Sequence, residues 1–332
     1  EMPAAWRLAL RRFAAAPQLQ RTRAALEGEG EGEGATQPVP SRADEYLLVQ
    51  TMLGTLPVGG LAEDALADYR ERIERYMLKA VREAKLRTSW LDPDPTYEEG
   101  LVAFIRSVLG RVRPNPLLGE LQALADVLAW FGAFNGLAMA ALKLTSPGVP
   151  DIYQGTELVD LSLVDPDNRR PVDYARRTRL LDELAALPAG EARPAALRAL
   201  AASPHDGRLK LWVTWRLLQL RREQPALFRD GGYAALAPTG ACADHVVAFA
   251  RAQGAATAIT LAGRLFAKLL GARTLAPVGD AWRDTRVVAA GLPEGTLLDD
   301  WVSGATLVVE DGEIALSRAF AALPVAVLVA RT

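Results

Sequence analysis

Cysteine and histidine are scarce in this 332-residue sequence, and their scarcity excludes several kinds of site. With Cys242 alone, the chain can form neither an internal disulfide nor a cysteine-based zinc site. The two histidines, His205 and His245, are too few for a typical histidine-rich metal site. We therefore expect no metal and no cofactor. The absence of disulfides is typical of a protein in the reducing cytoplasm.

The sequence also lacks an excess of charge and a long apolar run. Its 38 basic and 40 acidic residues give a net charge of −2, which disfavours nucleic acid or an anionic membrane as a partner. The longest charge-free apolar run, residues 127–142, is shorter than the roughly 18–20 residues that span a bilayer. The first residues, Glu-Met-Pro, resemble neither a signal peptide nor a natural start.

What the sequence does contain is ample material for a folded core. Half of the residues are hydrophobic and 23% are charged, which is typical of a globular protein. At roughly 100–200 residues per domain, this length predicts two domains.

Helical periodicity runs through the first two thirds of the chain. It is clearest over residues 62–87, where apolar residues recur at spacings of three and four and Glu71 and Arg75 add an i,i+4 ion pair. Thr96 and Glu99 form a capping box that predicts the start of the next helix. The Glu-Gly repeats at 27–34 predict a flexible loop over 27–40. The predicted helices cover residues 1–26, 43–57, 62–87, 96–108, 117–144, 175–187, 191–202 and 209–223.

The pattern changes after Pro225, where short β-rich runs alternate with turn signals. Such spacing predicts a small antiparallel sandwich. The predicted strands cover residues 246–250, 256–261, 286–289, 306–309 and 325–329.

A loop-rich segment separates two of the predicted helices. Ser-Pro-Gly at 146–148 is a stop-and-turn signal, and residues 149–153 are just long enough for a short buried strand. Gly155 then allows a sharp turn. In an α/β barrel, ligands bind where strands end and loops begin, so we expect a ligand at this segment.

The same segment carries a family resemblance. Residues 147–157, Pro-Gly-Val-Pro-Asp-Ile-Tyr-Gln-Gly-Thr-Glu, resemble the eighth-strand motif of the α-amylase superfamily. Residues 165–174, Asp-Pro-Asp-Asn-Arg-Arg-Pro-Val-Asp-Tyr, add a similarity to one branch, the maltooligosyl trehalose synthase family. Further matches extend the resemblance over nearly the whole chain. They lie at residues 44–48, 50, 53–54, 79–85, 88–90, 97–98, 206–211 and 247–251, while Arg87 departs from the histidine that is usual in the family.

The resemblance implies a mixed fold in three parts. A mostly α-helical insertion domain is expected over residues 1–125. The last βα unit of a (β/α)8 barrel follows over 126–228, and a small C-terminal antiparallel β-sandwich covers 229–332.

The resemblance also implies an activity for the parent enzyme. That family converts the reducing-end α-1,4 link of a maltooligosaccharide to an α,α-1,1 (trehalose) link by intramolecular transglucosylation. The superfamily takes its nucleophilic Asp, acid Glu and stabilising Asp from strands four, five and seven, all expected upstream of this sequence. A Thr-His-Asp motif of the strand-seven type is absent here. We therefore expect a C-terminal portion that is inactive alone, with the N-terminal barrel half and the maltooligosaccharide as partners.

Nine residues are candidates for sugar contact on the strength of this resemblance, and none is assigned as catalytic. Sugar recognition uses aromatic faces for CH groups and polar side chains for adjacent hydroxyls, and these residue types suit it. The candidates are Lys85, Ser89, Trp90, Tyr153, Gln154, Glu157, Asp167, Asn168 and Arg169.

Each group of candidates also has a structural alternative. Tyr153 and Glu157 can brace the loop instead. The Asp-Pro-Asp-Asn run at 165–168 forms Asx-type turns by itself, and the arginines that follow often pair with its acids. Lys85 can be solvated, and Trp90 can be a core residue.

Two other functions remain open at this point. One is a different hydrolase or transferase of the α-amylase superfamily, against which the 165–174 motif and the long helical insertion argue. The other is a non-catalytic glucan-binding or assembly module, which the missing catalytic carboxylates make more credible. For the parent enzyme, we hypothesise that residues 41–115 form a lid that excludes water from the covalent intermediate.

Overall fold

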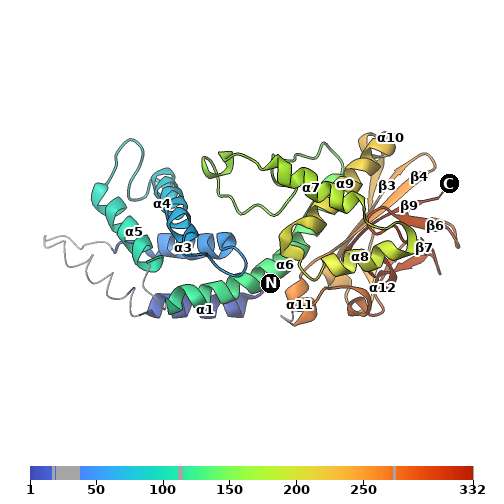
Figure 1. Ribbon diagram of the computed structural model, residues 1–332. Helices are drawn as coiled ribbons and strands as arrows, with labels where there is room; N and C mark the ends of the chain where they lie inside the picture. Colours follow the sequence, from blue (N-terminus) through green and yellow to red (C-terminus); the bar gives the residue numbers. More distant parts are fainter. Residues whose placement is uncertain (17–18, 20–37, 111–114, 272–273, 332) are drawn as a thin grey trace. The chain divides into compact units, whose positions relative to one another are not determined.

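The computed structural model describes residues 1–16, 19, 38–110, 115–271 and 274–331. These residues form two compact units (Figure 1). The helical unit comprises Met2–Leu128 and Leu161–Pro171, and the β-unit comprises Glu1, Ala129–Asp160 and Val172–Thr332. The three-part division expected from the sequence stays a prediction. The loop expected over 27–40 lies mostly outside the described residues.

The helical unit is built from amphipathic helices, as the apolar periodicity predicts. Asp94, and not Thr96, caps α5: its side chain accepts a hydrogen bond from the Tyr97 amide, and Pro95 fills the first turn. The predicted capping box is therefore wrong, because an Asp-Pro pair just upstream offers a stronger start signal. The helices are α1 (Pro3–Ala15), α3 (Arg42–Thr55), α4 (Ala65–Ala84), α5 (Pro95–Val108) and the first part of α6 (Pro116–Thr145).

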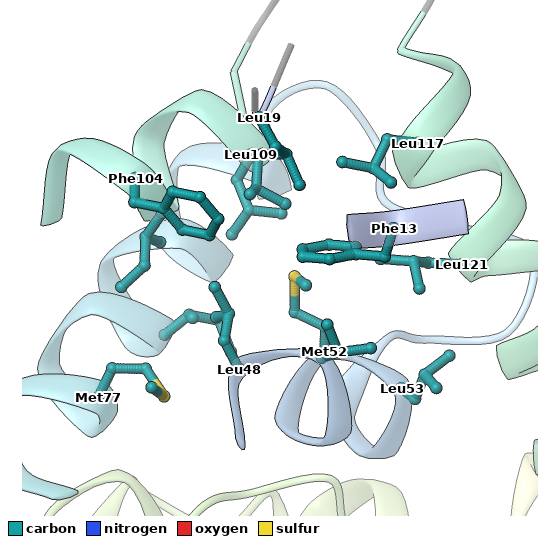
Figure 2. Close-up of a cluster of buried hydrophobic side chains, with 14 of the residues drawn as sticks. Phe13, Leu19, Leu48, Met52, Leu53, Met77, Phe104, Leu109, Leu117 and Leu121 are labelled. Atoms are coloured by element: carbon teal, nitrogen blue, oxygen red, sulfur yellow. The ribbon is translucent and has the colours of Figure 1, made fainter. Parts of the chain in front are cut away.

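The core of the helical unit gathers side chains from all of these helices (Figure 2). On α4 the buried positions are Tyr69, Ile73, Met77 and Val81, which recur every four residues along one face. The other faces of α4 therefore remain available for polar contacts. Residues that face the core from the other helices include Phe13, Leu48, Met52, Phe104 and Leu121.

The β-unit has its own helices and two antiparallel sheets. The helices are α7 (Tyr174–Ala185), α8 (Arg193–Leu200), α9 (Arg208–Glu223), α10 (Pro225–Arg229), α11 (Phe266–Leu270), α12 (Leu316–Ala319) and the rest of α6. The larger sheet has the strand order β1-β3-β4-β9-β6-β7, and the smaller has the order β2-β5-β8. The strands are β1 (Gly232–Ala235), β2 (Pro238–Thr239), β3 (Val246–Gln253), β4 (Ala256–Gly263), β5 (Arg286–Val288), β6 (Leu297–Asp300), β7 (Thr306–Val308), β8 (Glu313–Ala315) and β9 (Val325–Ala330).

All five strands predicted after Pro225 are present in these sheets. The long β3–β4 hairpin and the pairing of β4 with β9 form the centre of the larger sheet. β9 carries four successive buried residues, as expected for a strand covered on both faces. The mixed helical and antiparallel character is therefore confirmed, while the barrel and sandwich arrangements stay predictions.

The strand expected at residues 149–153 is not formed; these residues have no strand assignment. A parallel barrel strand depends on hydrogen bonds from neighbouring strands, and every strand pair among the described residues is antiparallel and lies after residue 231. Without such neighbours, a short apolar run does not become a strand.

Among the described residues, helix α6 is the longest helix, with 30 residues. By length and composition alone it is sufficiently apolar to cross a membrane, and 39% of its most apolar window is buried within the protein. A core helix passes the same test, so this is weak evidence for a membrane span. The prediction of no membrane partner stays a prediction.

Candidate functional site

In the β-unit, Tyr153, Gln154 and Glu157 lie on a tight turn that follows α6. The Thr156 amide and hydroxyl both donate to the Tyr153 carbonyl, at 3.1 and 2.7 Å. Gly155 has φ = +90° at this turn, a conformation that favours glycine. The turn leaves the Tyr153 side chain 45% exposed, so its ring is accessible to a ligand.

Arg177 of α7 holds this turn from the other side. Its Nη2 donates to the Gly155 carbonyl at 2.7 Å, and its guanidinium pairs with the Glu157 carboxylate. Tyr174 donates its hydroxyl to Gln154 Oε1 at 3.4 Å. Glu157 therefore braces the loop in this structure, which is the structural alternative weighed from the sequence. The sequence analysis did not name Arg177, because the motif that contains Glu157 gives no sign that this carboxylate pairs with an arginine of the following helix.

In the helical unit, the loop that carries Asp167 is fastened to α4. Arg72 donates from Nε to Asp167 Oδ1 at 3.0 Å and from Nη2 to Oδ2 at 2.9 Å. The Leu163 amide donates to the same carboxylate at 2.7 Å, and Lys79 donates to the Asp165 carbonyl at 2.6 Å. Arg72 and Lys79 are seven residues apart, so they lie on one side of α4, two turns apart.

These contacts decide the charge state of Asp167. Partial burial alone opposes ionisation, but the hydrogen bonds from Arg72 and Leu163 outweigh it and lower the pKa of Asp167. A carboxylate with three such donors has little capacity left for a sugar hydroxyl. The geometry therefore favours a loop-shaping role for Asp167.

Asn168 and Arg169 lie in the short 3-10 turn formed by Asp167–Arg169. Arg169 forms an ion pair with Asp165, and Arg170 lies 3.4 Å from the Asp167 carboxylate, which confirms the expected pairing of the arginines with the acids of this run. The Oδ1 atom of Asn168 is buried without a hydrogen-bond partner among the described residues.

Lys85, Ser89 and Trp90 share the loop between α4 and α5. Lys85 ends α4 in the left-handed conformation, with φ = +56°, and its side chain is exposed. Ser89 and Asp92 close a small turn, in which the Asp92 amide donates to Ser89 Oγ at 2.9 Å. Trp90 is 55% exposed, so the alternative that it is a core residue is wrong. This loop therefore carries an exposed indole, a lysine and a serine, which are residue types that suit sugar recognition.

An ion pair between α4 and α5 supports this loop. Arg82 of α4 and Glu98 of α5 form a two-point ion pair, with donor–acceptor distances of 2.8 and 2.6 Å. The hydrogen bond from Arg82 is the main cause that lowers the pKa of Glu98; burial opposes it, and a hydrogen bond from Thr88 adds to it. The sequence contains no signal for this pair because its members are separated by a whole turn-and-loop segment.

A pocket of about 370 Å³ lies between the start of α3 and the end of α4. Ser41, Asp44, Leu86 and Arg87 are among its lining residues, so it adjoins the loop that carries Lys85. Within the described part of the chain, no group of three or more His, Cys, Asp or Glu residues is arranged to hold a metal ion. Of the nine predicted residues, six lie in the helical unit on two loops, and Tyr153, Gln154 and Glu157 lie in the β-unit.

Comparison with known proteins identifies what the chain resembles. A protein from Mycobacterium tuberculosis that is named as a maltooligosyl trehalose synthase is 35% identical over 295 residues, which cover 89% of this chain. The solved maltooligosyltrehalose synthase from Arthrobacter ramosus is 34% identical over 98% of this chain, with a TM-score of 0.67. The chain is similar to one part of a maltooligosyl trehalose synthase.

The extent of the match agrees with the expected portion of that enzyme. The chain spans 32% of the length of the Mycobacterium relative and 37% of the Arthrobacter structure. A further crystal structure titled maltooligosyl trehalose synthase, at 24% identity and a TM-score of 0.64, supports the fold alone. No family model matches the chain. The resemblance predicted from the two sequence motifs is confirmed.

Proposed function

We propose that the chain is the substrate-contacting, non-catalytic portion of a maltooligosyl trehalose synthase. The parent enzyme would move the reducing-end glucose of a maltooligosaccharide from an α-1,4 to an α,α-1,1 link by intramolecular transglucosylation. The observation that carries the proposal is the agreement of sequence and structure with the Arthrobacter synthase over 98% of this chain, at 34% identity.

The state of the acids supports the non-catalytic assignment. A general acid for glycoside cleavage needs a raised pKa, so that it keeps its proton until the leaving oxygen takes it. Asp167 and Glu98 have lowered pKa values because arginines hold them ionised. Glu157 and Asp165 form ion pairs with Arg177 and Arg169. These carboxylates are suited to shaping loops, and the catalytic carboxylates would come from another part of the parent protein.

The remaining candidates are suited to holding the sugar. Trp90 and Tyr153 offer exposed aromatic surface, and Lys85 and Gln154 offer exposed polar groups. Within the parent, such residues would keep the cleaved glucose in place while it is turned and rejoined, and would help to exclude water from the intermediate.

The experiment is the turnover of maltopentaose, followed as loss of reducing ends. We expect no turnover by this chain alone, and turnover when a segment that carries the upstream catalytic carboxylates is added. Loss of reducing ends separates trehalose-end formation from hydrolysis, which raises their number. Turnover by the chain alone would contradict the non-catalytic assignment, and a rise in reducing ends with the complemented pair would favour a hydrolase.

A non-catalytic glucan-binding module is the second candidate. The arginine-paired acids favour it as much as they favour a portion of the synthase. Binding of maltopentaose by this chain, with no turnover after the upstream segment is added, would support the module.

A further inference from the structure

The ion pair between Arg82 and Glu98 contacts the loop that carries Trp90. Glu98 is 9% exposed, and both of its carboxylate oxygens accept hydrogen bonds from the guanidinium of Arg82. A two-point contact of this kind fixes the plane of the guanidinium as well as its position. Glu98 therefore determines where the flat face of Arg82 points.

The guanidinium of Arg82 lies over the ring of Trp90, with its Cζ atom 4.8 Å from the ring centroid. This distance is within the range of a cation–π contact. Arg82 lies over one face of the indole and Trp90 stays 55% exposed, so the opposite face is the surface that we consider for a ligand. A pyranose ring presents a flat patch of CH groups that fits such a face.

The same carboxylate also ties the loop to α5. Thr88 donates its hydroxyl to Glu98 Oε1 at 2.6 Å and accepts a hydrogen bond from the Asp94 amide at 3.0 Å. Thr88 and Asp94 lie on either side of Trp90 in the sequence, so these hydrogen bonds join the two ends of the loop. A ring held in this way loses little conformational entropy when a ligand stacks on it.

We propose that Glu98 and Arg82 are positioning residues that hold the indole of Trp90 as a preformed stacking platform for a glucose ring of a maltooligosaccharide. The proposal rests on the proposed function for its ligand class, and on the contacts above for the positioning itself. Neither Glu98 nor Arg82 needs to touch the sugar. Their effect on binding passes through Trp90.

The structure provides a matched control in a second ion pair between the same two helices. Arg106 of α5 donates to both oxygens of Glu74 on α4, at 2.9 and 3.0 Å. None of the aromatic contacts found in the described structure involves this pair. Glu74→Gln therefore removes a two-point link between the same helices, one whose arginine is more exposed and whose acid also lies 3.7 Å from Arg70, and it leaves Trp90 untouched. Glu98→Gln removes the link to the arginine that lies over Trp90.

The first measurement follows the indole without any ligand. The protein is labelled with 5-fluorotryptophan, and the ¹⁹F resonance that disappears in Trp90→Phe is assigned to Trp90. We expect this resonance to shift in Glu98→Gln and to keep its position in Glu74→Gln. An unchanged resonance in a folded Glu98→Gln variant, as judged by its thermal unfolding, would overturn the positioning role.

The second measurement is the affinity for maltopentaose by calorimetry. Loss of one aromatic stacking contact predicts about tenfold weaker binding for Trp90→Ala, and loss of its support predicts about threefold to fivefold weaker binding for Glu98→Gln. Glu98→Gln should have no further effect in the Trp90→Ala background, because coupled residues are not additive. An equal effect in both backgrounds, or an equal effect of Glu74→Gln, would overturn the proposal.

The two measurements separate this proposal from the proposed function. If the folded wild-type protein does not bind maltopentaose, the glucan assignment is wrong, and the fluorine resonance still decides whether Glu98 positions Trp90. If maltopentaose binds and Trp90→Ala has no effect, the glucan assignment stands and the stacking platform is refuted.

Discussion

Arg251 is the residue whose removal should damage the β-unit most. It lies on β3, is 1% exposed, and has no carboxylate partner among the described residues. Its guanidinium instead donates to four backbone carbonyls, at distances of 2.7 to 3.2 Å. The carbonyls belong to Thr145, Phe228, Gly231 and Gly232.

The magnitude of the effect follows from these four contacts. Arg251→Met keeps most of the apolar stem and leaves four acceptors without their donor. A buried acceptor that loses its donor costs about 1–3 kcal/mol, and partial relaxation keeps the total below the simple sum. We expect a loss of about 3–5 kcal/mol, which is a fall of roughly 6–20 °C in Tm for a unit of 150–250 residues. The stability of Arg251→Lys should lie between those of the wild type and Arg251→Met, because one ammonium group cannot reach all four carbonyls.

The assay is thermal unfolding followed by near-UV circular dichroism, with Arg331→Met as the matched control. Arg331 pairs with Asp299 through two hydrogen bonds of 2.7 and 2.6 Å, but both side chains are at least 42% exposed. An exposed pair contributes at most about 1 kcal/mol. A fall in Tm of the same size for both variants would refute the argument that burial makes the loss of the Arg251 hydrogen bonds more costly than the loss of the exposed Arg331 hydrogen bonds.

Two further predictions concern the candidate site. Asp167→Asn should cost about 2 kcal/mol, because the partly buried Arg72 loses its charged partner. Because the pKa of Asp167 is lower in the folded than in the unfolded protein, its ion pair stabilises the fold above the unfolded pKa, and this stability is lost as the pH falls through the folded pKa. The difference in free energy of unfolding between wild type and variant, measured by urea titration, should therefore shrink on acidification. A difference that does not change with pH would contradict the ion-pair account. Gly155→Ala should cost about 1–3 kcal/mol, because the residue has φ = +90° and its new methyl group would lie 3.3 Å from Arg177 Nη2. Gly254→Ala is the control for steric crowding, because Gly254 also has a positive φ, +58°, but open space around it. Equal losses of stability for the two variants in thermal unfolding would show that only the backbone conformation matters.

The helices and the long strands could be predicted from the sequence because their periodicity reflects local burial. α4 buries every fourth residue, and β9 is a continuous apolar run. Four short strands, β1, β2, β6 and β8, were not predicted. The residues of β1 and β2 are mostly exposed, so no apolar alternation marks them, and β6 and β8 have only four and three residues. The strand at 149–153 was wrongly predicted because strand formation depends on neighbours that the local sequence does not reveal.

In the candidate site too, local features could be predicted from the sequence and long-range contacts could not. The turn at Gly155 and the pairing of Arg169 with Asp165 are local, and the sequence predicted both. The contact of Arg72 with Asp167 joins residues 95 positions apart, so it depends on how the loop meets α4. A motif can therefore indicate which residues form a loop without indicating which helix holds it.

These long-range contacts give the acids of the site a common role. Asp167 and Glu98 each face an arginine from a different element, and in both cases the arginine keeps the carboxylate ionised. A carboxylate held in this state cannot act as a proton donor at neutral pH, but it fixes a loop with little motion. Glu157, in the β-unit, forms an ion pair with Arg177. These pairs fasten the loops that carry the candidate residues to neighbouring helices, and the proposed transfer needs such restraint if a cleaved sugar is to be retained and water excluded.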